Sequence, residues 1–139
     1  MKHKIKKAKY EKQAYSENWL VFDDDNRDIN IILQQLPNQS QYVYNSISIE
    51  FWFLLHFKNT SRQFKDSKAV IIELEKEFGT YSKTDINLWK KLEHLYDKAK
   101  ERARKLRNKQ SEARTQLQYC KPYSNMDNLV DRVKRFEKN

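Results

Sequence analysis

A single glycine, Gly79, limits the tight turns that this chain of 139 residues can make. Glycine takes backbone angles that other residues avoid, and many tight turns and phosphate-binding loops depend on it. Its scarcity, together with only two prolines, favours helices over a β-sandwich. It also excludes glycine-rich phosphate loops and dinucleotide-binding turns, which need several glycines at fixed spacing. A chain of this length suits one domain with a hydrophobic core of its own.

The chain is strongly basic, because 28 lysines and arginines outnumber 19 aspartates and glutamates and give a formal net charge of +9. This charge predicts a polyanionic partner, and the many aromatic residues favour nucleic acid over a membrane. We expect residues 1–17 to form a basic N-terminal arm, followed by a single α/β domain over residues 18–139. The arm either contacts phosphate without sequence preference or serves as a solubilising tail. Its phosphate-contacting candidates are Lys2, Lys4, Lys6 and Lys7.

The solitary Cys120 excludes an internal disulfide and every cysteine-based zinc pattern, and it fits a reducing compartment. No apolar run of signal-peptide length follows the basic N-terminus. The most apolar stretch, residues 47–57, is too short to cross a bilayer. We therefore expect a cytoplasmic protein that does not act at a membrane.

An apolar run, Trp-Leu-Val-Phe at residues 19–22, ends abruptly in Asp23, Asp24 and Asp25. The run predicts a short buried strand, because these residue types favour a pleated, buried surface. Ligands of α/β proteins bind beyond the carboxyl ends of the strands, and Asp23 and Asp25 point to the same side if the strand continues. Two interpretations stay open: a pair of carboxylates that shares a Mg²⁺ ion, or a solvated acidic turn that caps the next helix.

The next elements predict a strand–helix–strand unit. Asn26 or Asp28 caps a helix that extends to about residue 36, and residues 42–44 then form a second strand. This order implies a right-handed crossover and a parallel pair of strands. We expect a small, helix-rich α/β fold with a short parallel sheet and helices in its C-terminal part.

Residues 46–57 are apolar on nearly all sides, so they predict a helix that is buried on more than one face. A buried strand is the competing interpretation. Glu50 and His56 are the polar exceptions, and Glu50 falls in the first helical turn, where a carboxylate suits the helix dipole. A histidine beside such a run is more often a hydrogen-bonded structural residue than an active-site residue, and both roles stay open.

Amphipathic spacing predicts a helix over residues 67–78, which Gly79 ends, and a long helix from about residue 84 to beyond residue 106. Residues 119–123 resemble a connector, and a last helix follows Asn125 or Asp127. The long helix carries a basic row beside its apolar stripe. This row is either a nucleic-acid-facing surface or a solvated face whose side-chain stems pack along the core edge. Its members include Lys98, Arg102, Lys105 and Lys109.

Three stretches carry a resemblance to a known family. The first is Val-Phe-Asp-Asp-Asp at residues 21–25, and the second, more specific one is Ile-Glu-Phe-Trp-Phe-Leu-Leu-His-Phe at residues 49–57. The third runs from Tyr-Ser-Lys at residues 81–83 through the long helix to residues 122–130. Taken together, they resemble the RloB-like family of bacterial phage-defence proteins, which includes abortive-infection members. The resemblance covers about residues 19–130.

This resemblance implies a Toprim-like α/β fold, in which acidic residues hold Mg²⁺ for phosphodiester chemistry. It then assigns Asp23 and Asp25 as metal ligands, Glu50 as a third carboxylate, and His56 as an acid/base group or a structural partner. Lys83 joins the basic row of the long helix as a phosphate-binding residue.

The sequence departs from the family's pattern at two places. Only the basic arm precedes Trp19, where a Toprim-like site has a strand that bears a glutamate, and Asn-Ser-Ile at residues 45–47 replaces Ser-Asn-Pro. We therefore expect a truncated Toprim-like core. A sheet without one of its edge strands exposes unpaired backbone groups, so a protein partner or a second copy is expected to complete it.

These departures favour a non-catalytic or degenerate RloB-like protein that binds nucleic acid or a nucleoprotein partner in phage–host conflict. Such a protein is either a defence subunit or a phage or plasmid inhibitor such as an anti-CRISPR. The alternative is a Mg²⁺-dependent Toprim-type nuclease that uses Asp23, Asp25 and Glu50.

Overall fold

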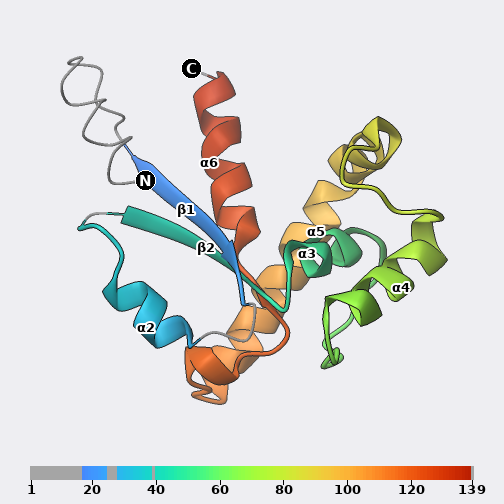
Figure 1. The fold of residues 1–139 in the computed structure, drawn as a ribbon. Helices are drawn as coiled ribbons and strands as arrows, with labels where there is room; N and C mark the ends of the chain where they lie inside the picture. The colour runs from blue at the N-terminus through green and yellow to red at the C-terminus, as the bar shows by residue number, and fades with distance from the viewer. Residues whose placement is uncertain (1–16, 25–27, 39, 139) are drawn as a thin grey trace.

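The computed structural model describes residues 17–24, 28–38 and 40–138, and within them three strands form one mixed sheet (Figure 1). Strands β1 (Asn18–Asp23) and β2 (Ser40–Ser46) are parallel, with Asp23 opposite Asn45. The predicted parallel pair is confirmed. The third strand, β3 (Tyr123–Ser124), pairs antiparallel with β2. The sheet is therefore not purely parallel, and the segment predicted as a connector contributes a strand.

The helix between β1 and β2 is α2 (Ile29–Gln34), which is shorter than predicted. Of the two predicted caps, Asp28 is the one used, because its carboxylate accepts a hydrogen bond from the Asn30 amide at 2.9 Å. Ile29 is buried and anchors the first turn of the helix. The crossover from β1 to β2 thus begins directly beyond the three acids, and the start of the helix is fixed by one of the residues that follow them.

Three helices build the main core beside the sheet: α3 (Ile49–Phe57), α4 (Ser67–Phe78) and α5 (Ile86–Glu112). Residues 46–57 thus form a helix and not the alternative strand, and every side chain from position 50 to position 56 is buried. Figure 1 shows α3, α4 and α5 gathered together, with α2 lying apart from them. Leucines from all three helices meet in this core, and burying each one contributes about 1.5–3 kcal/mol.

Local signals fix the ends of α4 as the sequence predicts. The Asp66 carboxylate accepts a hydrogen bond from the Ala69 amide at 2.9 Å, which satisfies one of the free amides of the first turn. At the other end, Gly79 has a φ of 104°, a backbone conformation that side chains disfavour. The one glycine of the chain therefore stands where α4 must stop.

The last helix, α6 (Met126–Lys138), is joined to the sheet through Asn125. The Asn125 side chain accepts a hydrogen bond from the Tyr44 amide at 2.8 Å and donates one to the Tyr42 carbonyl at 3.3 Å. The side chain thereby continues the pairing of β3 with β2.

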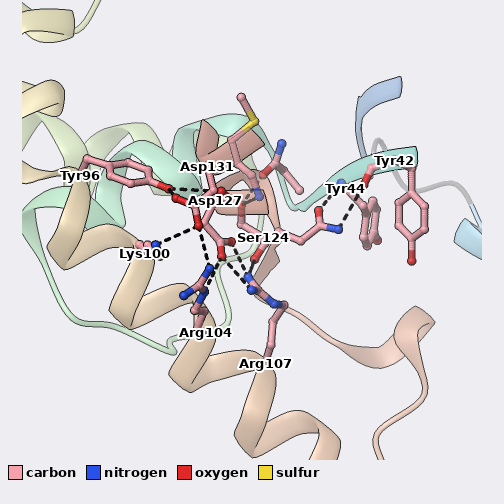
Figure 2. A network of polar contacts seen from close by, with 12 residues as sticks. Tyr42, Tyr44, Tyr96, Lys100, Arg104, Arg107, Ser124, Asp127 and Asp131 are labelled. Carbon is pink, nitrogen blue, oxygen red and sulfur yellow. Dashed lines mark hydrogen bonds and ion pairs between the residues drawn. The ribbon is translucent and has the colours of Figure 1, made fainter. Parts of the chain in front are cut away.

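A network of charged groups ties α6 to α5 (Figure 2). The fully buried Asp127 accepts two hydrogen bonds from the Arg107 guanidinium, at 2.6 and 2.9 Å, and one from Arg104 at 3.2 Å. Arg107 also donates to the Ser124 carbonyl at 2.7 Å, so the same guanidinium holds β3. A second acid, Asp131, contacts Tyr96, Lys100 and Arg104.

Within the described part of the chain, no helix is long and apolar enough to span a membrane.

Candidate functional site

A polar cavity of about 310 Å³ lies at the carboxyl ends of β1 and β2, where the strand-end rule predicts a ligand site. Of the predicted site residues, Asp23, Glu50 and Lys83 all line this cavity, which we call the strand-end cavity. Its lining also includes charged residues that the sequence did not single out. They are Asp24, Lys65, Asp66 and Lys121.

Of the two acids of the triplet that the structure describes, Asp24 is the one whose side chain is buried. Its backbone amide donates to the Asn45 carbonyl at 3.1 Å, which extends the β1–β2 pairing by one step. Its buried carboxylate accepts a hydrogen bond from the Ser46 hydroxyl at 2.9 Å, and the Lys121 ammonium lies 3.3 Å away. Strict strand alternation would turn Asp24 away from Asp23, but β1 ends at Asp23 and the alternation ends with it.

Glu50 enters the strand-end cavity from the first turn of α3, as predicted. Its side chain is buried, and the Lys83 ammonium lies 3.7 Å from Oε1, a distance typical of an ion pair rather than a hydrogen bond. Burial raises the pKa of Tyr81, and the negative charges of Glu50 and Asp23 raise it further. Both carboxylates thus act on the same hydroxyl.

Several buried polar atoms of the strand-end cavity have no hydrogen-bond partner among the residues that the structure describes. They are Oδ1 of Asp24, Oε2 of Glu50 and the Ser48 hydroxyl, and all three residues line the cavity. An unsatisfied buried polar group costs free energy, so such atoms mark a place where a ligand, an ion or water completes the structure. Ser48 precedes α3 but does not cap it with its side chain, which leaves its hydroxyl available.

The donor set suits a divalent cation only in part. Carboxylate oxygens are the ligands that Mg²⁺ prefers, and Mg²⁺ commonly takes only one or two carboxylates beside water and phosphate. Among the residues that the structure describes, however, no group of three or more His, Cys, Asp or Glu side chains lies close enough to hold a metal ion. Asp25 lies outside the described residues, so its pairing with Asp23 stays a prediction.

His56 does not join Glu50, because the two residues stand at opposite ends of α3. The imidazole is buried, its Nδ1 lies 2.9 Å from the Trp52 carbonyl, and it lines a separate cavity. Burial lowers the pKa of His56 to about 4, so the ring is neutral near neutral pH. These contacts support a structural role for His56, whose ring is hydrogen-bonded within α3. The residue lies away from the strand-end acids.

The basic row of α5 is divided in its contacts. Arg102 donates a hydrogen bond to the Leu55 carbonyl at 2.7 Å and so satisfies one of the free carbonyls in the last turn of α3. Lys98, Lys105 and Lys109 remain exposed. The arm lysines lie outside the described residues, so their contacts with phosphate stay a prediction.

Lys65 and Lys121 are the cationic residues that sequence reasoning missed. Lys121 lies in the segment predicted as a connector, and Lys65 lies in a polar loop, where no periodicity marks a residue as functional. The sequence marks Lys121 only by its position before Pro122, because a proline lacks the backbone amide and indicates a constrained turn. That signal does not reveal which acid the lysine meets.

The fold and this cavity together define an α/β protein with a polar cavity at the carboxyl ends of β1 and β2, where buried acids lie beneath lysines. A family model described as RloB-like protein matches residues 1–133, and the chain belongs to the RloB-like family. The match includes residues 1–18, which lie upstream of the stretch that carries the resemblance in the sequence. Comparisons with curated proteins and with solved structures gave no match.

Proposed function

We propose that this RloB-like protein binds nucleic acid by holding backbone phosphate at the mouth of the strand-end cavity. The observation that carries the proposal is the layering of charge there. The side chains of Lys83 and Lys121 are 63% and 45% exposed, whereas those of their partners Glu50 and Asp24 are 6% and 4% exposed. A phosphate that approaches from solvent meets the ammonium groups first, and the buried acids hold those groups in place.

The overall charge supports the same ligand. The net charge of +9 attracts a polyanion over several ångströms and raises the association rate at low salt. The exposed lysines of α5, Lys98, Lys105 and Lys109, add a second basic surface, and the lysines of residues 1–17 add further positive charge. Contacts of this kind are indifferent to base sequence, so the proposed binding depends on salt more than on sequence.

Binding is tested with labelled single-stranded DNA, duplex DNA and RNA, with and without Mg²⁺, by fluorescence anisotropy and on denaturing gels. We expect retarded, intact nucleic acid and a salt dependence that weakens in the double variant Lys83→Gln/Lys121→Gln. Each lost phosphate contact lowers the salt slope by about 1. The matched control is Lys90→Gln, which removes an exposed lysine of α5 outside the cavity.

Two results contradict the proposal. One is the absence of binding to all three nucleic acids at low salt in either metal condition. The other is a double variant with the same affinity and salt slope as the wild type, because the lysines at the cavity mouth then carry none of the binding.

A second candidate function, Mg²⁺-dependent cleavage, is favoured by the unpartnered oxygens of Asp24 and Glu50 in one cavity. Four acids and three lysines line this cavity, so its local charge also favours a cation. Asp23 and Asp25, with Glu50, would hold the ion, which supplies positive charge to the phosphate oxygens during transfer. Cleavage in Mg²⁺ or Mn²⁺ that is lost in Asp23→Asn/Asp25→Asn would establish this function. Activity that survives in the double variant would rule it out.

The biological setting that we propose is phage–host conflict, which the family resemblance implies. The strong positive charge disfavours DNA mimicry, which requires an acidic surface, and allows contact with a guide RNA or its groove. Expression in a phage-sensitive host should lower plating efficiency if the protein serves defence. It should raise plating on a CRISPR-protected host if the protein is an inhibitor. Unchanged plating in both hosts contradicts both roles.

A partner that completes the sheet also remains a proposal. In the part of the chain that the structure describes, β1 lies at one edge of the sheet, and Val21 on it is 47% exposed. An exposed edge strand is a template for pairing with another chain. Sedimentation over a wide concentration range should show self-association, and a monomer throughout would exclude a homodimer.

A further inference from the structure

A second cavity, of about 280 Å³, lies beside α3 where Trp52 and His56 face it, and its lining combines rings and aliphatic side chains with Glu93 and Lys134. Trp52, Trp89 and Tyr96 contribute three rings, and the His56 imidazole contributes a fourth. Ligand pockets typically measure about 300–1,000 Å³, so this cavity suits a single ring system better than a larger molecule. We call it the aromatic cavity.

Its rings are held in fixed orientations. The Trp89 indole donates to the Lys83 carbonyl at 2.9 Å and packs edge-on against Phe53, with the ring centroids 5.3 Å apart. Trp52 packs edge-on against both His56 and Tyr96. Trp89 is nevertheless 46% exposed, so one of the fixed rings is presented to solvent. A preorganised, exposed aromatic surface costs little entropy when another ring stacks on it.

The aromatic cavity also contains a specific hydrogen-bond acceptor. A carbonyl can only accept, so His56 Nδ1 carries the proton that it donates to the Trp52 carbonyl. Since burial lowers the pKa of His56 to about 4, the ring stays neutral and Nε2 keeps its lone pair. A ligand N–H is the group that complements it.

A polar cavity of about 310 Å³ adjoins the aromatic cavity and shares Tyr96 and Lys134 with it. The Lys134 ammonium lies 4.1 Å from the centroid of the Tyr96 ring, at the boundary between the two. The polar cavity has three cationic and two acidic side chains in its lining, and Lys100 is paired with Asp131 at 2.9 Å, so Lys134 and Arg135 are the cations that we assign to an anion. Its remaining charged residues are Asp97, Lys100, Asp131 and Arg135.

From this geometry we propose that the aromatic cavity binds the base of a nucleotide, whose phosphate lies against Lys134 and the adjoining polar cavity. The base stacks on Trp89 and donates an N–H to His56 Nε2. An aliphatic side chain would fill the ring-lined space but would neither donate a hydrogen bond to the acceptor nor bring a negative charge to Lys134 and Arg135. This site shares no lining residue with the strand-end cavity, so it goes beyond the proposed phosphate contact and each of the two can fail without the other.

The probes are nucleoside monophosphates, with ribose 5-phosphate as the matched ligand that lacks a base. Intrinsic fluorescence reports the binding, because two of the three tryptophans line the aromatic cavity. In a Trp19→Phe background only those two tryptophans emit. We expect quenching by the monophosphates and none by ribose 5-phosphate. Quenching by both ligands, or by neither, overturns the proposal.

Oligonucleotides distinguish a strand from a free nucleotide. A single-stranded oligomer should bind more tightly than its duplex if an unpaired base of a strand is the natural ligand. Equal affinity, with monophosphate quenching retained, assigns the aromatic cavity to free nucleotides. In either case Lys83→Gln/Lys121→Gln should keep the quenching, because those lysines line the strand-end cavity instead. Loss of quenching in that variant contradicts a separate base site.

Two variants test the stacking directly. Trp89→Ala should weaken monophosphate binding about tenfold, which lies within the range for loss of one base–aromatic stack. Val130→Phe should abolish binding by filling the aromatic cavity while keeping the Trp89 side chain and its hydrogen bond to the Lys83 carbonyl. The control is Tyr119→Ala, which removes an aromatic ring that is 65% exposed and outside the cavity. Equal affinities in all three variants, with cooperative unfolding retained, would refute the assignment.

Discussion

His56 should make the protein lose stability as the solution becomes mildly acidic. Its imidazole is buried in the folded protein, and burial lowers its pKa from 6.5 to about 4. A proton therefore binds more readily to the unfolded chain than to the folded one. The stabilisation is complete above pH 6.5 and is lost as the pH falls toward about 4.

The size of the loss follows from the two pKa values. They differ by about 2.5, which corresponds to on the order of 3 kcal/mol over the whole range. Between about pH 7.5 and about pH 5 the loss should be about 2 kcal/mol, because the folded-state imidazole is still mostly neutral at the lower value. The carboxyl groups of Glu17, Glu73 and Asp131 have lowered pKa values, so their losses begin at lower pH.

Urea denaturation at a series of pH values measures this effect as the free energy of unfolding. His56→Asn removes the titrating group and keeps a donor for the Trp52 carbonyl, so its stability should be lower but much flatter between about pH 5 and about pH 7. The control is His94→Asn, which removes an exposed imidazole of α5 and should keep the wild-type slope. Equal slopes for the wild type and His56→Asn would refute the argument.

Two further substitutions test the core and the charged network by urea denaturation. Asp127→Asn should lower the free energy of unfolding by about 3 kcal/mol, because it leaves Arg107 facing a neutral group in a buried setting. The control, Glu101→Gln on the exposed face of α5, should lower it little. An Asp127 variant as stable as the control would show that the network adds no net stability. Leu54→Ala should lower the free energy of unfolding by about 2–5 kcal/mol, because it opens a cavity in the main core. Ile72→Ala should lower it by less than about 0.5 kcal/mol, because the Ile72 side chain is 56% exposed. Similar costs for these two would contradict the packing described for α3.

The sequence by itself determined the elements whose ends depend on neighbouring residues. The bounds of α4 were predicted because its apolar spacing and Gly79 are local signals. The parallel β1–β2 pair followed from the order of strand, helix and strand, and the position of the acids followed from the end of β1. The family was also within reach of the sequence, because the specific motif at residues 49–57 is continuous.

Only the tertiary structure decided which distant residues meet. Lys121 lies beside Asp24, and Arg102 caps α3 by contacting Leu55, which is 47 residues away in the sequence. Neither pairing has a periodic signature, since each depends on how separate elements pack. The same holds for His56, which the length of one helix separates from Glu50 although the two residues belong to one motif. Periodicity specifies the face of an element, whereas a site is specified by the packing of several elements.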